Sequence, residues 1–143
     1  MAPSWPAKQL ALIADIAELQ IASCRADGTL RRWTPIWVVC VDGQVYVRTW
    51  YRRTTGWFGR LLDSGQARVR VPGLETDVVA EDVGDASSEL RARVDDAYRN
   101  KYGGLAAERM VADPAAATTL RLAPAYRELS PRRPARSPRT SAG

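Results

Sequence analysis

The stretch that most constrains the fold runs from Trp33 to Trp50. Its first part, Trp33 to Val41, is rich in aromatic and β-branched residues, Asp42-Gly43 is a two-residue turn signal, and Val45 to Trp50 resumes the apolar pattern. Asp-Gly favours the positive backbone angles that a tight turn between two strands requires. The pattern therefore predicts a β-hairpin, and the rest of the chain is expected to serve as its scaffold.

A basic loop and a short helix are predicted to follow this hairpin. Arg52 and Arg53 precede Thr55, which is placed as an N-cap, and Gly65 is placed as the stop of a helix with apolar residues at helical spacing. The free N–H groups of a helix start carry partial positive charge, and arginine forks suit phosphate or carboxylate. The loop is thus a candidate anion site; the alternative is a solvated strand end beside an ordinary N-cap.

Alternation and helical spacing predict the remaining elements. They are a helix over Trp5–Leu19, strands over Glu18–Arg25, Ala67–Val71, Glu75–Val83 and Thr118–Leu122, a helix from Asp85 or Ser87 to about Tyr102, and a short helix over Leu105–Ala112. In the long helix the tyrosines at 98 and 102 continue an apolar stripe, so we expect them to pack in the core with their hydroxyls at its rim. Six short strands with helices between them predict a mainly β protein, a small barrel with helical decorations.

The composition indicates one domain followed by a tail. Residues 1–126 form the predicted domain, whereas residues 127–143 are rich in proline, serine and arginine and are expected to be disordered. The tail carries +4 of the net charge of +5, so the domain itself is nearly neutral. Nucleic-acid binding through this tail, with Arg68 and Arg70, therefore ranks last among the functions considered.

Several chemistries are excluded by the residues that the chain lacks or uses sparingly. The sequence contains no histidine, which removes histidine-based nucleophilic catalysis and the commonest transition-metal ligand. Cys24 and Cys40 show no zinc-binding spacing, so we expect both to be reduced core residues in a cytoplasmic protein with no metal site. No apolar run is long enough to cross a membrane, and no membrane partner is expected.

Four segments together resemble a known group of proteins. They are RRWTPIWVVCVDGQVYVRT, the run Trp57-Phe58-x-Arg60-Leu61-Leu62, the strand ARVRV, and the helix end AYRNKYG. These resemble the FMN-binding split-barrel proteins, a group that includes pyridoxamine-phosphate-oxidase-like and deazaflavin-dependent reductases, and most of all the bacterial family called domain of unknown function 2255. The resemblance covers about Leu19 to Leu122 and implies a six-stranded split β-barrel, a homodimer, and FMN or a deazaflavin coenzyme at its interface.

The resemblance also implies roles for particular residues. The phosphate of the cofactor would be bound by Arg48, Thr49, Arg52, Arg53 and Thr55 with support from Arg60, and its ring would be lined by Thr34, Pro35, Ile36 and Trp37. An aromatic wall for a substrate would come from Trp33, Trp50 and Tyr51. The implied phosphate site coincides with the anion site that the residues themselves predict.

Two functions follow as expectations. The first is a flavin- or deazaflavin-dependent oxidoreductase that passes hydride to a small organic substrate, with the cofactor carrying the chemistry. The second is a cofactor-free small-molecule-binding protein or non-redox catalyst that uses a tryptophan-lined pocket. The spacing of residues singles out no catalytic residue for either function, so retention of a cofactor is the observation that separates them.

Overall fold

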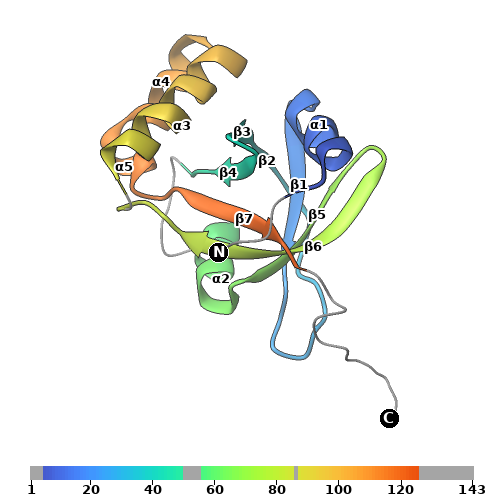
Figure 1. The fold of residues 1–143 in the computed structure, drawn as a ribbon. Helices are drawn as coiled ribbons and strands as arrows, with labels where there is room; N and C mark the ends of the chain where they lie inside the picture. Colours follow the sequence, from blue (N-terminus) through green and yellow to red (C-terminus); the bar gives the residue numbers. More distant parts are fainter. Residues whose placement is uncertain (1–4, 50–55, 86, 126–143) are drawn as a thin grey trace.

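The computed structural model describes residues 5–49, 56–85 and 87–125 (Figure 1). The helices are α1 (Ala7–Asp15), α2 (Gly56–Ser64), α3 (Ser88–Lys101), α4 (Gly104–Val111) and α5 (Asp113–Ala116). The strands are β1 (Glu18–Ser23), β2 (Thr34–Trp37), β3 (Val39–Val41), β4 (Gln44–Val47), β5 (Gln66–Val71), β6 (Leu74–Asp82) and β7 (Leu120–Pro124). Among the described residues the strands form one antiparallel sheet in the order β2-β1-β5-β6-β7-β4-β3.

This sheet is a nearly closed barrel. Strands β2 and β3 stand at the two ends of the strand order, yet only Val38 separates them in the chain. The chain itself therefore joins the two edges of the sheet, which is the geometry of a split barrel. The predicted fold class, mainly β with helices and built as a split barrel, is confirmed.

The predicted hairpin is smaller than expected because its first strand is broken at Val38. The N–H of Val38 donates to the hydroxyl of Tyr102 (3.0 Å), and Lys101 Nζ donates to the Val38 carbonyl oxygen (2.7 Å). Both backbone groups are thus bonded to α3. The first half of the predicted strand pairs with β1 instead, and only β3 and β4 form the hairpin across Asp42-Gly43. This break explains why the barrel has seven strands where six were predicted.

Two predicted elements have different bounds for identifiable reasons. Helix α1 is shorter than the predicted Trp5–Leu19 because Ile16 already has extended backbone angles and β1 begins at Glu18. Strand β7 begins at Leu120, two residues after the predicted start at Thr118. The reason is that the hydroxyls of Thr118 and Thr119 donate to the carbonyls of Ala115 and Ala116 (2.6 Å each) at the end of α5.

Two apolar clusters hold the fold together. The barrel interior is filled by inward residues of the strands, and Phe58 and Leu61 of α2 join them, both with no exposed surface. A second cluster lies between α3, α4 and the outer side of β3 and β4, where Val94 and Tyr98 pack on Val39 and Tyr46. Helix α3 begins at the predicted N-cap Ser87, whose hydroxyl accepts from the N–H of Leu90 (3.0 Å). The predicted stripe of this helix is confirmed as packing surface, but the Tyr98 hydroxyl, which was expected at the rim of the core, is buried.

A pair of tyrosine variants tests the junction at Val38. Tyr102→Phe removes the partner of the fully buried Val38 N–H, so we expect a loss of about 1–3 kcal/mol in the free energy of unfolding by urea. Tyr98→Phe is the matched control, because among the described residues the buried Tyr98 hydroxyl has no hydrogen-bond partner. Its removal should leave stability unchanged or slightly raised. Equal losses in the two variants would contradict the role given to Tyr102.

Candidate functional site: an aromatic groove on the outer face of the barrel

The outer face of β2, β1 and β5 carries the candidate site. The register places Trp37 opposite Glu18, Pro35 opposite Gln20, and Gln20 opposite Arg70. Because directly opposed residues in an antiparallel pair share a face, these five side chains point to the same side of the sheet. The residues between them, Ile36 and Leu19 among others, are buried in the barrel. Of the predicted ring-lining segment, Pro35 and Trp37 therefore point outward, whereas Thr34 and Ile36 point inward.

A groove of about 780 Å³ opens on this face, at the end of the barrel covered by α1. Its volume suits a small molecule. The lining residues come from the α1–β1 junction, the two neighbouring strands and the end of α3, and they are Ile16, Ala17, Glu18, Gln20, Trp37, Arg70, Val71, Pro72 and Tyr102.

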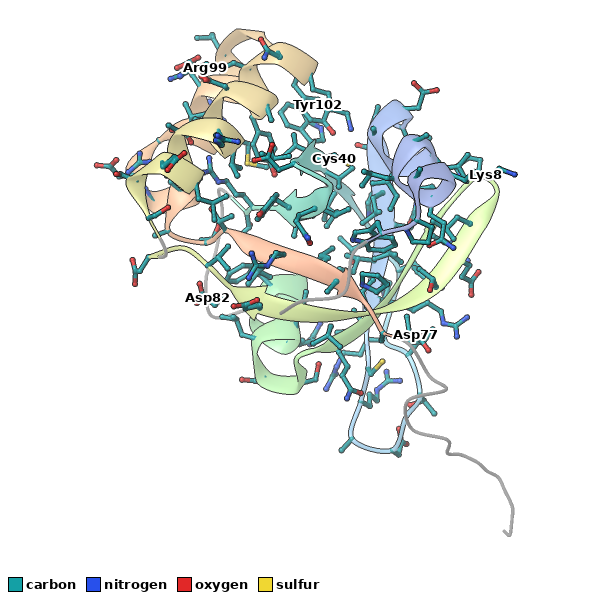
Figure 2. The ribbon with its side chains drawn as sticks, in the orientation of Figure 1. Lys8, Cys40, Asp77, Asp82, Arg99 and Tyr102 are labelled. Atoms are coloured by element: carbon teal, nitrogen blue, oxygen red, sulfur yellow. The ribbon has the colours of Figure 1, made fainter. Side chains whose placement is uncertain are left out.

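The aromatic wall of the groove is rigidly held. The rings of Trp37 and Tyr102 stack in parallel, with centroids 3.8 Å apart and planes inclined by 1°. The Tyr102 hydroxyl accepts from Val38 and donates to the Ala17 carbonyl oxygen (2.6 Å), and Figure 2 shows this side chain between the α3–α4 pair and α1. Burial raises the pKa of the Tyr102 hydroxyl, which keeps the proton in that bond at neutral pH. The wall is thus an ordered surface already present in the free protein.

Two charged side chains line the groove, and neither has an ionic partner within the described ranges. They are Arg70 and Glu18. Arg70 places its guanidinium over the ring of Trp33, 4.1 Å from the centroid. Its neighbour Arg68 differs, since it forms ion pairs with Glu75 (2.9 Å) and Asp77 (3.0 Å). The charge of Arg68 is therefore neutralised on the barrel, whereas that of Arg70 is available to a ligand.

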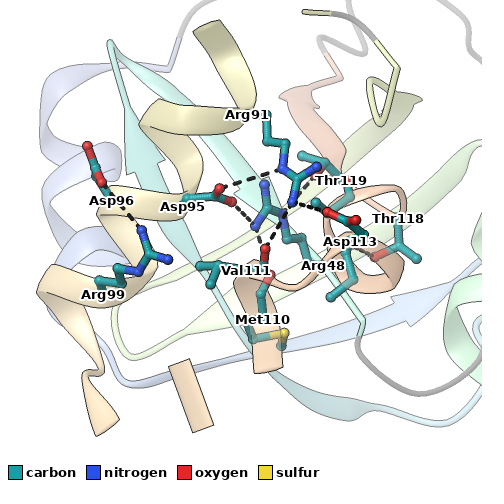
Figure 3. Close-up of polar contacts among 12 residues, drawn as sticks. Arg48, Arg91, Asp95, Asp96, Arg99, Met110, Val111, Asp113, Thr118 and Thr119 are labelled. Carbon is teal, nitrogen blue, oxygen red and sulfur yellow. Dashed lines mark hydrogen bonds and ion pairs between the residues drawn. The ribbon is translucent and has the colours of Figure 1, made fainter. Parts of the chain in front are cut away.

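Arg48, a predicted phosphate ligand, lies in the interior (Figure 3). Its guanidinium is buried and donates to Asp95 (2.7 Å), to the Met110 carbonyl oxygen (2.8 Å) and to the Thr119 hydroxyl (2.8 Å). Nη2 has no partner in the described part of the chain. These bonds fasten the end of β4 to the helical cluster. Thr49 is also buried, and its N–H donates to the Thr118 hydroxyl (2.9 Å).

The other predicted site residues lie elsewhere. Arg60 is exposed on α2. Residues Trp50, Tyr51, Arg52, Arg53 and Thr55 lie outside the described residues. Helix α2 leads into β5 where β1 ends, as the bond from Cys24 N–H to the Gln66 carbonyl oxygen shows, whereas the groove lies where β1 begins. Since β1 has six residues, Arg60 and Trp37 are separated by roughly the length of that strand, about 20 Å. Trp33 and Pro35 lie between them.

Sequence reasoning missed part of the groove. Arg70 was considered only for nucleic-acid binding, because nothing along the chain joins it to Trp33 or Trp37: β5 and β2 are brought to either side of β1 by the sheet order. Tyr102 was expected to have its hydroxyl at the rim of the core, and the periodicity of α3 gives no sign of its contact with Ala17. The alternation predicted over Glu18–Arg25 was a signal in the sequence that indicated this outer face.

The sheet forms a nearly closed barrel whose two edge strands meet at Val38, and a groove large enough for a small molecule lies beside this junction. These features define a split-barrel protein of the class that the sequence resembles. Residues 9–122 match the family described as an uncharacterized protein conserved in bacteria, DUF2255. The chain belongs to this family. No curated protein matches it.

Solved structures confirm the fold. The heme storage protein HutZ from Vibrio cholerae superimposes with a TM-score of 0.61 at 16% identity, over 83% of this chain and 89% of that one. A conserved hypothetical protein from Mycobacterium tuberculosis gives 0.57 at 16% identity, over 85% and 79%. An F420 reductase gives 0.50 at 16% identity, over 85% and 97%. At these identities the likeness establishes a shared split-barrel architecture.

None of the helices in the described ranges is both long and apolar enough to cross a membrane.

Two neighbouring aspartates test the buried Arg48 cluster. Asp95→Ala leaves a buried guanidinium without its carboxylate, and we expect unfolding to become easier by about 3 kcal/mol. Asp96→Ala is the control on the same helix, since this exposed side chain only approaches Arg99 at 4.0 Å, and its loss should change stability by less than about 0.5 kcal/mol. Urea unfolding measures both variants, and a small loss for Asp95→Ala would show that the pair contributes little.

Proposed function

We propose that this protein is a flavin- or deazaflavin-dependent oxidoreductase that passes hydride to a small organic substrate. The observation that carries the proposal is the outward row formed by Pro35 and Trp37 of β2 and by Trp33, which precedes this strand; the row leads from the end of the barrel at α2 into the groove. An F420 reductase has the same architecture, which supports the proposal.

The residues of this face fit a flavin-type ring. Such a ring is planar, with apolar faces and a polar edge. The side chains of Trp33, Pro35 and Trp37 offer flat apolar surface, and the half-buried Gln20 amide between them can both donate to and accept from a polar edge. When bound, a flavin or deazaflavin supplies the hydride. The phosphate would be held by Arg52, Arg53 and Thr55, with Arg60 in support, as the family resemblance implies.

The buried residues of the predicted site have a supporting role in this proposal. Because the guanidinium of Arg48 is hydrogen-bonded to Asp95, Met110 and Thr119, we assign Arg48 to positioning the end of β4, which precedes residues 50–55 in the chain. It does not contact the phosphate. The groove excludes water from one side of a bound ring through Ile16, Val71 and the Trp37–Tyr102 stack.

The proton that a reduced product needs does not come from the tyrosines of the core. Tyr46 and Tyr98 do not line the groove, and burial raises the pKa of the Tyr98 hydroxyl far above neutrality. The Tyr102 proton is held by Ala17. We therefore propose that the proton is delivered by solvent or by a group on the substrate.

A homodimer, in which a second copy covers this outer face, is also part of the proposal.

Binding of a cofactor by the wild-type protein is the first test. The concentrated protein is incubated with FMN or with the F420 coenzyme and desalted, and its ultraviolet–visible spectrum is recorded. We expect a retained absorption band for one of them. Trp37→Leu should weaken binding several-fold, because ring stacking contributes about 0.5–1.5 kcal/mol.

Arg93→Gln is the control, since this exposed arginine lies on α3, and its ion pairs are with Asp42 and Glu89. Its retention of cofactor should equal that of the wild type. A protein spectrum free of cofactor in every case, with tryptophan fluorescence unchanged by either compound, would overturn the redox proposal. The groove would then belong to a cofactor-free binding protein, the second function that the sequence allows.

A further inference from the structure

We propose that the groove binds a planar aromatic monocarboxylate that carries a hydroxyl or amine at the edge opposite its carboxylate. The proposal names the substrate class of the site described above. Its catalytic meaning rests on the proposed function, but the binding itself does not require a cofactor and is measurable without one.

Arg70 provides the carboxylate end. The central carbon of its guanidinium lies 4.1 Å from the centroid of the Trp33 ring, and a guanidinium placed over a ring keeps N–H groups that can form two parallel bonds to a carboxylate. No ion pair within the described part of the protein uses this edge, in contrast to Arg68 on the same strand and face. The groove therefore contains a fixed cation with unused donors.

Glu18 provides the opposite end. It is exposed at the start of β1 and, like Arg70, has no ionic partner among the residues described. Gln20 is the residue directly opposite Arg70, so Glu18 and Arg70 are diagonal neighbours with backbones about 7–8 Å apart. Both side chains line the same groove, so a ring whose carboxylate binds Arg70 can present its opposite edge to Glu18. A carboxylate in this position accepts from a hydroxyl or amine and repels a second negative charge, which disfavours phosphates and dicarboxylates.

The aromatic wall of the groove and the apolar residues beside it select for a planar ring between these two charges. Trp37 lies opposite Glu18, and its ring is fixed by the stack on Tyr102. Val71 and Pro72 add apolar surface beside it. An aliphatic acid of the same length would meet the same charges but would lose the stacking, which is on Trp37 in the cofactor-free protein and would be on the open face of the cofactor ring when one is bound.

The test uses three matched probes on the cofactor-free wild-type protein: 2-naphthoate, 6-hydroxy-2-naphthoate and 6-hydroxy-2-naphthalenemethanol. Binding is measured by calorimetry and by ligand-observed NMR. We expect the hydroxynaphthoate to bind best. Arg70→Gln should weaken both acids about tenfold or more and leave the alcohol unchanged, since only the acids use the charged bond. Glu18→Gln should reduce the advantage of the hydroxyl group.

Arg68→Gln is the control, since it removes the same charge from the same strand without lining the groove, and it should leave all three affinities unchanged. Absence of saturable binding to the wild type, or an equal loss of acid and alcohol in Arg70→Gln, would overturn the proposal. Binding of the acids without retention of a cofactor would contradict the redox function but not this substrate class. Retention of a cofactor without binding of the acids would contradict this substrate class but not the redox function.

Discussion

The fold depends on how the backbone of Val38 is bonded. The chain passes directly from β2 at one edge of the sheet to β3 at the other edge, and at Val38 between them the backbone is not paired with a neighbouring strand. The buried N–H and carbonyl groups at that residue therefore need other hydrogen-bond partners. Tyr102 and Lys101 supply them from the end of α3, one to the N–H and the other to the carbonyl of the same residue. The tyrosine hydroxyl also reaches the Ala17 carbonyl. One side chain thus ties together α3, the α1–β1 junction and the two edges of the sheet.

The same tyrosine makes the candidate site part of this junction. Its ring forms the groove wall with Trp37, while its hydroxyl closes the barrel, so the geometry of the site is set by the interaction that completes the fold. Further along α3, Tyr98 lies 6.0 Å from Tyr102 and beneath the Arg48 guanidinium, at 5.5 Å. A single helical stripe therefore supports both the groove and the buried cluster that anchors the end of β4. Pre-organisation of this kind lowers the entropic cost of binding a ligand.

Much of the fold could be predicted from the sequence. The helix expected to start at Asp85 or Ser87, the turn at Asp42-Gly43 and the strand expected over Ala67–Val71 all follow from local patterns and were confirmed. The break at Val38 could not be predicted, because Trp33 to Val41 reads as one uninterrupted strand. Nor could the burial of Arg48, since an arginine at the end of a strand looks the same whether its partner is a phosphate or an aspartate far along the chain.

The sequence by itself determined that the protein is mainly β, a small barrel with helical decorations and without histidine. Local backbone preferences and alternating polarity are short-range properties, and they suffice for that conclusion, whereas the split barrel was implied by the family resemblance. The tertiary structure decided which side chains share a site. It placed Arg70 across β1 from Trp33, Tyr102 against Trp37, and Arg48 against Asp95. Each of these contacts joins segments whose proximity depends on the order of strands in the closed sheet, and no local pattern encodes that order.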